Sequence, residues 1–296
     1  MSGEEKFVVR PWTEADLEGV FQLIDRENWG WELAEIRRIH KLDPRSSVVA
    51  EMDGELRGLV TVVNYGLMAF IVHVIVKEGW RRTGVGNVMV KSALETLGVA
   101  GVSRVELHAN PDVLGFYRQL GFHEADDIAF YSRDPSAEEA GSKGRIGAGG
   151  SVELLGMKEY GALSKLISTS MDVDAQDVAR SLKADPPDVI AGVVESGRLK
   201  GALLGKVGVR LNGIGPWVME EFDDDCAREM LRMVLSELPA KRTDVCIASA
   251  NGCSRYVTES EGFHLVKGGM VRTVKSAGPT SSYPPGLFAV GHFGVV

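Results

Sequence analysis

The chain has 296 residues and is 44% hydrophobic, enough to bury a sizeable core and, by length alone, to form about two domains. Its 41 acidic and 33 basic side chains give a formal net charge of −8, which argues against a nucleic-acid or anionic-membrane partner because both bind concentrated positive surface. No apolar run of about 18 residues and no basic-then-apolar N-terminus occurs, so we expect no membrane span and no export, and a cytoplasmic protein.

Hydrophobic periodicity predicts that strands and helices alternate through the first half of the chain. Asp53 and Gly54 favour the tight turn of a hairpin between two antiparallel strands. In chain order we predict a strand at 7–10, helices at 14–25 and 31–40, strands at 48–52, 59–63 and 70–76, a helix at 84–97, a strand at 104–109, a helix at 113–120 and a strand at 128–133.

The composition changes sharply in the middle of the chain. Between Pro135 and Ser151 it is mostly Ser, Ala, Glu and Gly, with little that is large and apolar, as is typical of a linker. We therefore predict a first domain over 1–135, a linker over 136–150 and a second domain over 151–296. The apolar residues 286–296 are expected to form a terminal strand that docks on a sheet of this chain.

The element order of the first half begins again after the linker, which suggests an internal repeat. A shift of 141 residues aligns distinctive positions without a gap, and the aligned pairs are Asn110 with Asn251, Gly121 with Gly262, and Phe122 with Phe263. The turn at Asp53-Gly54 aligns with Ser196-Gly197 at a slightly larger shift. We interpret the chain as a duplication with small insertions and deletions.

A basic glycine loop stands between the strand that ends at Val76 and the next helix. It carries the pattern Arg81-x-x-Gly84-x-Gly86. Glycines let the backbone approach an anion closely, the free N–H groups of the first helical turn point towards it, and the helix dipole adds about half a positive charge. The pattern predicts a phosphate cradle.

The second copy differs at this loop. Under the same shift the glycine loop becomes Phe222 followed by Asp223, Asp224 and Asp225, and three carboxylates repel a pyrophosphate. The same residues are also good N-cap and first-turn residues, so a purely structural second half explains them equally well.

The three cysteines, Cys226, Cys246 and Cys253, are odd in number and lack metal-ligand spacing. Reduced thiols are therefore expected, and no metal.

At these residues the chain resembles the GNAT superfamily of N-acyltransferases, whose phosphate loop reads Arg or Gln, x, x, Gly, x, Gly or Ala. The downstream residues that add to the resemblance are Asn110, Phe116-Tyr117 and Leu120-Gly121-Phe122. It covers residues 7–133 well and 151–275 in outline. It implies an α/β (α+β) fold of two tandem GNAT-like domains, each a mixed, splayed, mainly antiparallel sheet flanked by helices, with a competent first and a degenerate second domain.

The resemblance further implies that acetyl-CoA, or another short acyl-CoA, binds where the strand ending at Val76 parts from the strand 104–109. Loop amides would hold the pyrophosphate, the strand would pair with the pantetheine amides, and Asn110 would steady the arm. The predicted cofactor-binding residues are Val74, Ile75, Val76, Arg81, Arg82, Thr83, Gly84, Val85, Gly86, Asn110, Phe116 and Tyr117.

Transfer of an acyl group to a primary amine involves two proton transfers. The amine must be neutral when it attacks, and the departing thiolate must gain a proton. The matching family position makes Tyr117 the candidate acid, although it is also an aromatic residue on a buried helix face. His73 is a candidate base, but its odd parity on its strand turns the ring to the opposite face unless a bulge intervenes. Water or a carboxylate from residues 25–32 is the alternative base.

In this family the segment between the first two helices usually walls the acceptor pocket. Here it contains Trp29, Trp31 and Glu32. The two indoles fit a pocket lining or helix packing equally well, and Glu32 fits either an attraction for a cationic amine or a first-turn helix position.

The leading interpretation is an acetyl-CoA-dependent N-acetyltransferase for a small-molecule or amino-acid-like amine. The alternatives are a non-catalytic acyl-CoA-binding regulatory protein, which the missing base favours, and a protein or peptide N-acetyltransferase. The sequence is compatible with a monomer or a homodimer.

Overall fold

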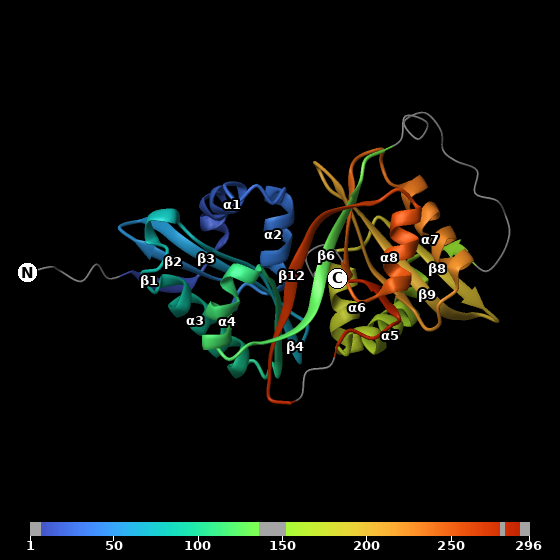
Figure 1. Ribbon diagram of the computed structural model, residues 1–296. Coiled ribbons are helices and arrows are strands. Elements are labelled where there is room, and N and C mark those ends of the chain that lie inside the picture. Colours follow the sequence, from blue (N-terminus) through green and yellow to red (C-terminus); the bar gives the residue numbers. More distant parts are fainter. Residues whose placement is uncertain (1–6, 136–151, 279–281, 291–296) are drawn as a thin grey trace, which may run out of the picture. The chain divides into compact units, whose positions relative to one another are not determined.

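The computed structural model describes residues 7–135, 152–278 and 282–290 (Figure 1). The predicted linker and residues 291–296 lie outside these ranges, so the division of the chain into domains at 136–150 stays a prediction.

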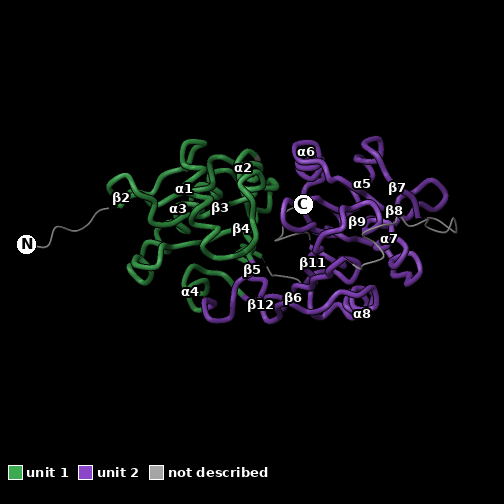
Figure 2. The backbone as a smooth tube through the Cα atoms, turned by 90° about the horizontal axis from the view of Figure 1, so that it is seen from above, with its two compact units in different colours: residues 1–107, 115–123, 274–279 green, residues 108–114, 124–273, 280–296 purple. Residues whose placement is uncertain are grey.

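The chain forms two compact units that do not follow chain order simply (Figure 2). Unit 1 comprises residues 1–107, 115–123 and 274–279, and unit 2 comprises residues 108–114, 124–273 and 280–296. Each unit therefore takes short segments from elsewhere in the chain.

The elements of the first half agree closely with those predicted. They are β1 (Val8–Pro11), η1 (Glu14–Asp16), α1 (Leu17–Asp25), α2 (Leu33–Leu42), β2 (Val48–Met52), β3 (Glu55–Asn64), β4 (Met68–Val76), η2 (Glu78–Trp80), α3 (Val85–Val99), β5 (Arg104–Ala109), η3 (Pro111–Val113) and α4 (Leu114–Gln119). In Figure 1, α1 and α2 lie on one face of the unit 1 sheet and α3 on the other. The boundary between the two units falls within β5, after Leu107.

The second half repeats this order. After β6 (His123–Arg133), which ends the first half, its elements are β7 (Val152–Leu154), η4 (Met157–Glu159), α5 (Tyr160–Met171), α6 (Ala175–Ala184), β8 (Val189–Glu195), β9 (Arg198–Val207), β10 (Asn212–Met219), α7 (Asp224–Glu237), β11 (Thr243–Ala248), α8 (Gly252–Ser260), β12 (His264–Ser276) and β13 (Leu287–Ala289). From β7 to β12 the succession of strands and helices matches β1 to β6.

Two local features repeat in atomic detail. The hairpin turns at Asp53-Gly54 and Ser196-Gly197 both have positive φ at both residues, the conformation in which glycine is favoured. After α4 and α8, Gly121 and Gly262 take φ of +85° and +86°. The next N–H, of Phe122 or Phe263, then donates to the carbonyl oxygen five residues back, at 3.1 and 3.2 Å.

The shift between the copies is not constant. Gly84, the N-cap of α3, corresponds to Asp223, the N-cap of α7, at a shift of 139 residues rather than 141. The shift of 141 holds at α4 and α8, so two residues are inserted just before Asn251. The structure therefore corrects the alignment of the glycine loop with the second copy by two positions. Carboxylates still stand where the first copy has glycines.

Each unit contains a mainly antiparallel sheet that splays at one strand. In unit 1 the order is β1-β2-β3-β4-β5, and in unit 2 it is β12-β6-β11-β10-β9-β8-β7. β4 and β5 are parallel and pair only at Met68–Phe70. β10 and β11 are parallel and pair only at residues 212–214. The predicted fold class, mixed and splayed with flanking helices, is confirmed.

A bulge marks the point where each splay begins. Thr61 faces His73 but Val62 faces Ile71, so Val72 is an extra residue in β4. In β10 the register with β9 shifts between Ile214 and Trp217. The bulges bend the two strands away from their parallel neighbours.

Strand ends from the two chain halves are exchanged between the units. β6 pairs with β11 over residues 243–248 of unit 2, where Arg133 Nε donates to the Glu261 carbonyl at 2.9 Å. The end of β12 belongs to unit 1, where Lys275 Nζ donates to the Leu120 carbonyl at 2.8 Å. Each cation satisfies a carbonyl at the C-terminal end of α8 or α4, the end that favours positive charge.

Unit 2 contains a buried ion pair. Arg272 Nη1 lies 2.7 Å from Asp126 Oδ2, with both side chains under a tenth exposed. The guanidinium carbon also stacks 4.0 Å from the ring centre of Tyr283. A buried ion pair contributes little net stability, but removal of one partner is costly because it leaves the other charge buried and uncompensated.

We expect Arg272→Leu to destabilise the chain by about 3–5 kcal/mol, because it leaves the Asp126 carboxylate buried without its cation. The double change Arg272→Leu with Asp126→Leu should recover most of this loss. The free energy of unfolding in urea measures both, and a single variant that is no less stable than the double variant would contradict the expectation.

Candidate active site

The junction between β4 and α3 has the geometry of an anion site. Gly84 is the N-cap of α3 with φ of +92°, and Arg82 before it also has positive φ, +66°. No side chain caps the helix, and its first turn carries no acidic residue. The first N–H groups of this 15-residue helix are therefore available as hydrogen-bond donors. The two left-handed residues before it, Arg82 and Gly84, shape the loop that leads into the helix.

Three predicted cofactor residues from different elements meet at the start of α3. A Cβ placed on Gly86 would lie 3.4 Å from Val76 Cγ2 and 3.7 Å from Phe116 Cζ. The glycine thus keeps the helix start close to the end of β4 and to α4. Val74 and Ile75 precede Val76 on β4 and pair with Val60 and Leu59 of β3.

The side chains of the loop are partly engaged. Arg81 Nε donates to the Val76 carbonyl at 3.0 Å, and its Nη2 lies 2.7 Å from Glu27 Oε1. Thr83 Oγ1 donates to the Trp80 carbonyl at 2.7 Å. Arg81 therefore ties the loop after α1 to the end of β4, a contact that the sequence did not reveal because 54 residues separate the partners.

Tyr117 lies on α4 and is buried. Its ring packs edge-on against Phe116 and Phe122, with centroids 5.0 and 5.8 Å away. Burial raises the pKa of the Tyr117 phenol well above its usual value, so the hydroxyl stays protonated at neutral pH. A protonated hydroxyl is the form that an acid needs.

His73 follows the bulge at Val72, and its register with β3 is unbroken as far as Val76, so it keeps the odd parity expected from the sequence. The ring stacks on Trp29 at 5.8 Å and meets Trp31 edge-on at 4.7 Å, so the structure joins three predicted site residues. His73 is 1% exposed, and neither ring nitrogen has a hydrogen-bond partner among the described residues. Thr61, directly opposite on β3, is also buried, with its hydroxyl unpartnered in the same part of the chain.

Burial lowers the pKa of His73 to about 3, because no charged partner offsets the loss of water. The imidazole is therefore neutral at physiological pH. It can accept or donate a hydrogen bond, but a pKa this low makes it a weak base.

The other predicted site residues are buried or half-buried, or cap helices. Trp31 is 3% exposed and Trp29 is half-buried. Glu32 is the N-cap of α2, and its N–H donates to Glu35 Oε2 at 2.8 Å, the arrangement of a capping box. Asn110 is the N-cap of η3 and belongs to the segment that clusters with unit 2, so its role beside the cofactor stays a prediction.

The helix start in the second copy is occupied by its own side chains. Asp223 Oδ1 accepts the N–H of Cys226 at 2.8 Å, and Asp224 pairs with Arg228 at 3.0 Å. These contacts confirm that the acidic run serves as N-cap and first turn. Thr258 stands where the first copy has Tyr117.

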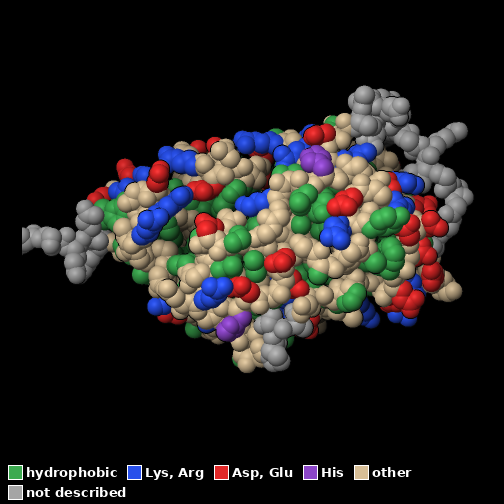
Figure 3. Space-filling model, in the orientation of Figure 1, with side chains coloured by type: hydrophobic (Ala, Val, Ile, Leu, Met, Phe, Trp, Pro, Cys, Tyr) green, Lys and Arg blue, Asp and Glu red, His purple; other side chains and the backbone are tan. Residues whose placement is uncertain are grey.

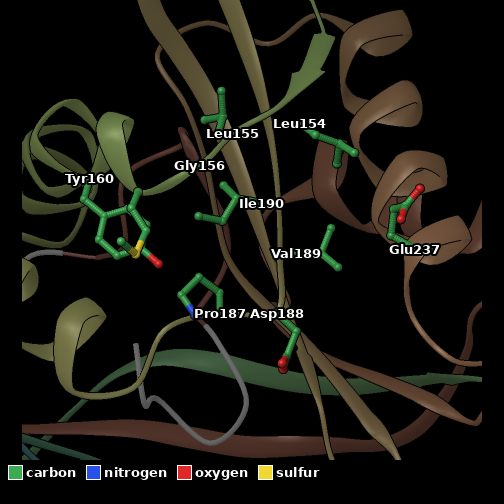
Figure 4. Close-up of a pocket in the computed structure, with 10 residues that line it drawn as sticks. Leu154, Leu155, Gly156, Tyr160, Pro187, Asp188, Val189, Ile190 and Glu237 are labelled. Atoms are coloured by element: carbon green, nitrogen blue, oxygen red, sulfur yellow. The ribbon is translucent and has the colours of Figure 1, made fainter.

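One pocket lies in unit 2 between the segment after β7, the start of β8 and the end of α7, and none of the predicted site residues line it (Figure 4). Acidic and basic side chains are interspersed on the face shown in Figure 3. Within the described ranges, no three His, Cys, Asp or Glu side chains gather as metal ligands, and no helix is long and apolar enough to cross a membrane.

The first half of the chain thus combines a splayed α/β sheet with a glycine-capped helix beside the splay. Residues 11–122 match the Acetyltransferase (GNAT) family.

Relatives and solved structures agree in fold. The chain is 39% identical over 54 residues to GCN5-related N-acetyltransferase 1, chloroplastic, of Arabidopsis thaliana, a match that covers 18% of this chain and 27% of that protein. A putative acetyltransferase from Pyrococcus horikoshii superposes with a TM-score of 0.78 at 16% identity, over 100% of this chain and 98% of the other.

A tandem GNAT protein from the clavulanic acid biosynthesis pathway gives a TM-score of 0.64 at 16% identity, over 93% of this chain and 100% of the other. At this identity the structures establish the fold. The chain spans about a quarter of the length of the Arabidopsis relative.

The burial of His73 predicts a pH effect on stability. Its folded pKa of about 3 lies below the unfolded value near 6.5, so the unfolded chain binds the proton first as the pH falls. Stability from this group is complete above about pH 6.5 and is lost towards pH 3.

Between pH 7 and pH 5 the free energy of unfolding should fall by on the order of 2 kcal/mol more in the wild type than in His73→Leu. Denaturant unfolding at both pH values gives the comparison. Equal slopes in the two proteins would show that His73 is not a neutral buried imidazole.

Proposed function

We propose that the chain is an N-acetyltransferase that moves an acetyl group from acetyl-CoA, or another short acyl-CoA, to the primary amine of a small-molecule or amino-acid-like acceptor. The observation that carries the proposal is the uncapped, uncharged start of α3, placed beside the part of β4 that has parted from β5. The match of residues 11–122 to the Acetyltransferase (GNAT) family supports the reaction class.

The diphosphate of the cofactor would bind the amides around Arg82 to Gly86. A helix N-terminus favours an anion by about 0.3–1 kcal/mol at the surface, and several N–H donors act together here. Arg81 and Arg82 add positive charge at the same loop. The pantetheine arm, which carries two amides, would pair with β4 as an added strand beyond Phe70, where the described residues provide no partner strand on that side.

Direct attack of the amine on the thioester breaks the carbon–sulfur bond and forms the amide. We assign Tyr117 as the group that donates a proton to the departing CoA sulfur because of its matching position in the family pattern; its raised pKa keeps the hydroxyl protonated but does not strengthen it as an acid. His73 would orient the amine as a neutral hydrogen-bond acceptor beside Trp29 and Trp31. Its low pKa argues against it as the base, so we propose that the amine loses its proton to water or to a carboxylate of the loop after α1.

A second candidate, an acyl-CoA-binding regulatory protein without turnover, is favoured by the lack of a strong base among the predicted site residues. A thiol-release assay over a panel of amines, beside calorimetry with CoA, separates the two. Binding of CoA with no turnover on any acceptor would favour the regulatory protein.

We expect Gly84→Asp to abolish binding of acetyl-CoA, because a carboxylate would occupy the start of α3 and repel the diphosphate. Gly101→Asp is the matched control: it lies just past the other end of α3, has φ of +84°, and also opens onto free space. Calorimetry should show normal affinity for the control. Equal loss in both variants would mean that backbone strain and not the anion site is responsible.

We expect Tyr117→Phe to lower kcat by roughly 100-fold or more while leaving the Kd of acetyl-CoA nearly unchanged, because it removes only the proton donor. Tyr131→Phe removes a hydroxyl that bonds to Glu259 in unit 2 and serves as the control. Steady-state kinetics and calorimetry give both quantities. Unchanged turnover in Tyr117→Phe would remove this residue as the acid.

A further inference from the structure

The C-terminal segment of the chain occupies the splay of unit 2. β13 pairs antiparallel with β10 at Trp217 and Val218, beyond the point where β10 leaves β11. The Val290 N–H donates to the Cys246 carbonyl of β11 at 3.0 Å. One short strand is thus bonded to both diverging strands, in the position where a GNAT domain would receive an acyl-CoA arm.

The main chain of this segment is held along its length. The Met219 N–H donates to the Gly286 carbonyl at 2.8 Å, and Ser254 Oγ donates to the Phe288 carbonyl at 2.6 Å. Asn251 Nδ2 donates to the carbonyls of Pro285 and Leu287, each at 3.1 Å. Four consecutive carbonyls, of residues 285 to 288, therefore have donors, and Asn251 is the duplicate of the Asn110 predicted to steady the pantetheine arm.

The side chains of the segment are also enclosed. Leu287, Phe288, Ala289 and Val290 are each 1% exposed. Phe288 packs on Trp217 of β10 at 5.2 Å and stacks on Phe222 at 5.7 Å. Phe222 stands in the loop that leads into α7, where the first copy has its basic glycine loop, so the phosphate side of the splay has become an aromatic wall.

Gly286 lies so close to the main chain of β10 that only glycine fits at this position. A Cβ on Gly286 would lie 2.3 Å from the Met219 carbonyl oxygen, which is main chain and cannot rotate away. Gly278, in the segment that leads to this tail, has nothing within 4 Å of such a Cβ. The site therefore distinguishes glycine from alanine at 286 by geometry alone.

We propose that the splay of unit 2 is a peptide-strand-binding groove, and that its resident ligand is the segment Pro285 to Val290 of the same chain. The second copy has exchanged a thioester-binding slot for one that recognises an extended peptide with glycine at the Met219 contact and an aromatic residue two positions later. Main-chain hydrogen bonds hold the ligand and the Trp217–Phe222 wall selects its side chain. The inference does not depend on catalysis by the first copy.

The test uses full-length chains and a fluorescent synthetic peptide with the sequence of residues 282–290. In Gly286→Ala the chain's own tail is dislodged, so the peptide should bind this variant at least tenfold more tightly than the wild type or Gly278→Ala, whose tails compete at high effective concentration. A peptide with alanine in place of its glycine should not bind. Amide hydrogen exchange should accelerate at Met219 and Val290 in Gly286→Ala alone.

Each other outcome overturns the proposal. Absence of peptide binding to Gly286→Ala, or equal binding to all three chains, would show that the segment is not a ligand of a groove. Global unfolding of Gly286→Ala that the peptide does not reverse would make β13 an ordinary core strand. Binding of acetyl-CoA at the emptied groove of Gly286→Ala would show that the slot had kept its cofactor chemistry.

Discussion

The structure depends on one constraint, the need to satisfy main-chain groups where a central strand leaves its parallel neighbour. A bulge bends β4 away from β5 after Phe70 and bends β10 away from β11 after Ile214. Buried backbone N–H and C=O groups require partners, so a splayed edge is a site for an extended, amide-bearing chain. In unit 2 this partner is a strand of the protein itself, and it shows what kind of molecule the geometry accepts.

Charge at the adjacent helix start determines which partner each copy can take. In the first copy a glycine N-cap and an acid-free first turn leave several N–H donors for an anion. In the second, Asp223 already accepts one of these N–H groups, and Asp224 and Asp225 add negative charge. Because a single helix terminus is worth about 1 kcal/mol, two further carboxylates within a few ångströms reverse its preference. The start of α3 is therefore suited to an anion, whereas the corresponding part of the second copy holds a neutral strand.

Much of this could be predicted from the sequence because it is local. Periodicity and turn residues placed nearly every element of the first half within a few residues, and the glycine loop lies at the uncapped start of α3. The duplication was visible because Gly121 and Gly262 require positive φ and therefore mark the same turn. The docking of the terminal strand on a sheet of the chain is confirmed for Leu287–Ala289, although its place in the splay was not foreseen.

What could not be predicted depends on register and on distant pairing. Nothing in the sequence of β4 indicates the extra residue at Val72, or that His73 meets Trp29 and Trp31 from the segment between α1 and α2. β6 pairs with β11 of the second half, and the end of β12 belongs to unit 1. Such pairings join strands far apart in sequence, so local sequence patterns do not reveal them. The Arg81–Glu27 ion pair could not be predicted either, because each side chain alone has the sequence pattern of an ordinary exposed charge.

The stoichiometry and place of acetyl-CoA binding test the account most directly. Calorimetric titration of the full chain should give one equivalent per chain, and hydrogen exchange should show new protection at the amides of Arg82 to Gly86 with none at Asp223 to Ala227. Two equivalents, or protection at the start of α7, would contradict the assignment of one open slot and one filled by the chain itself.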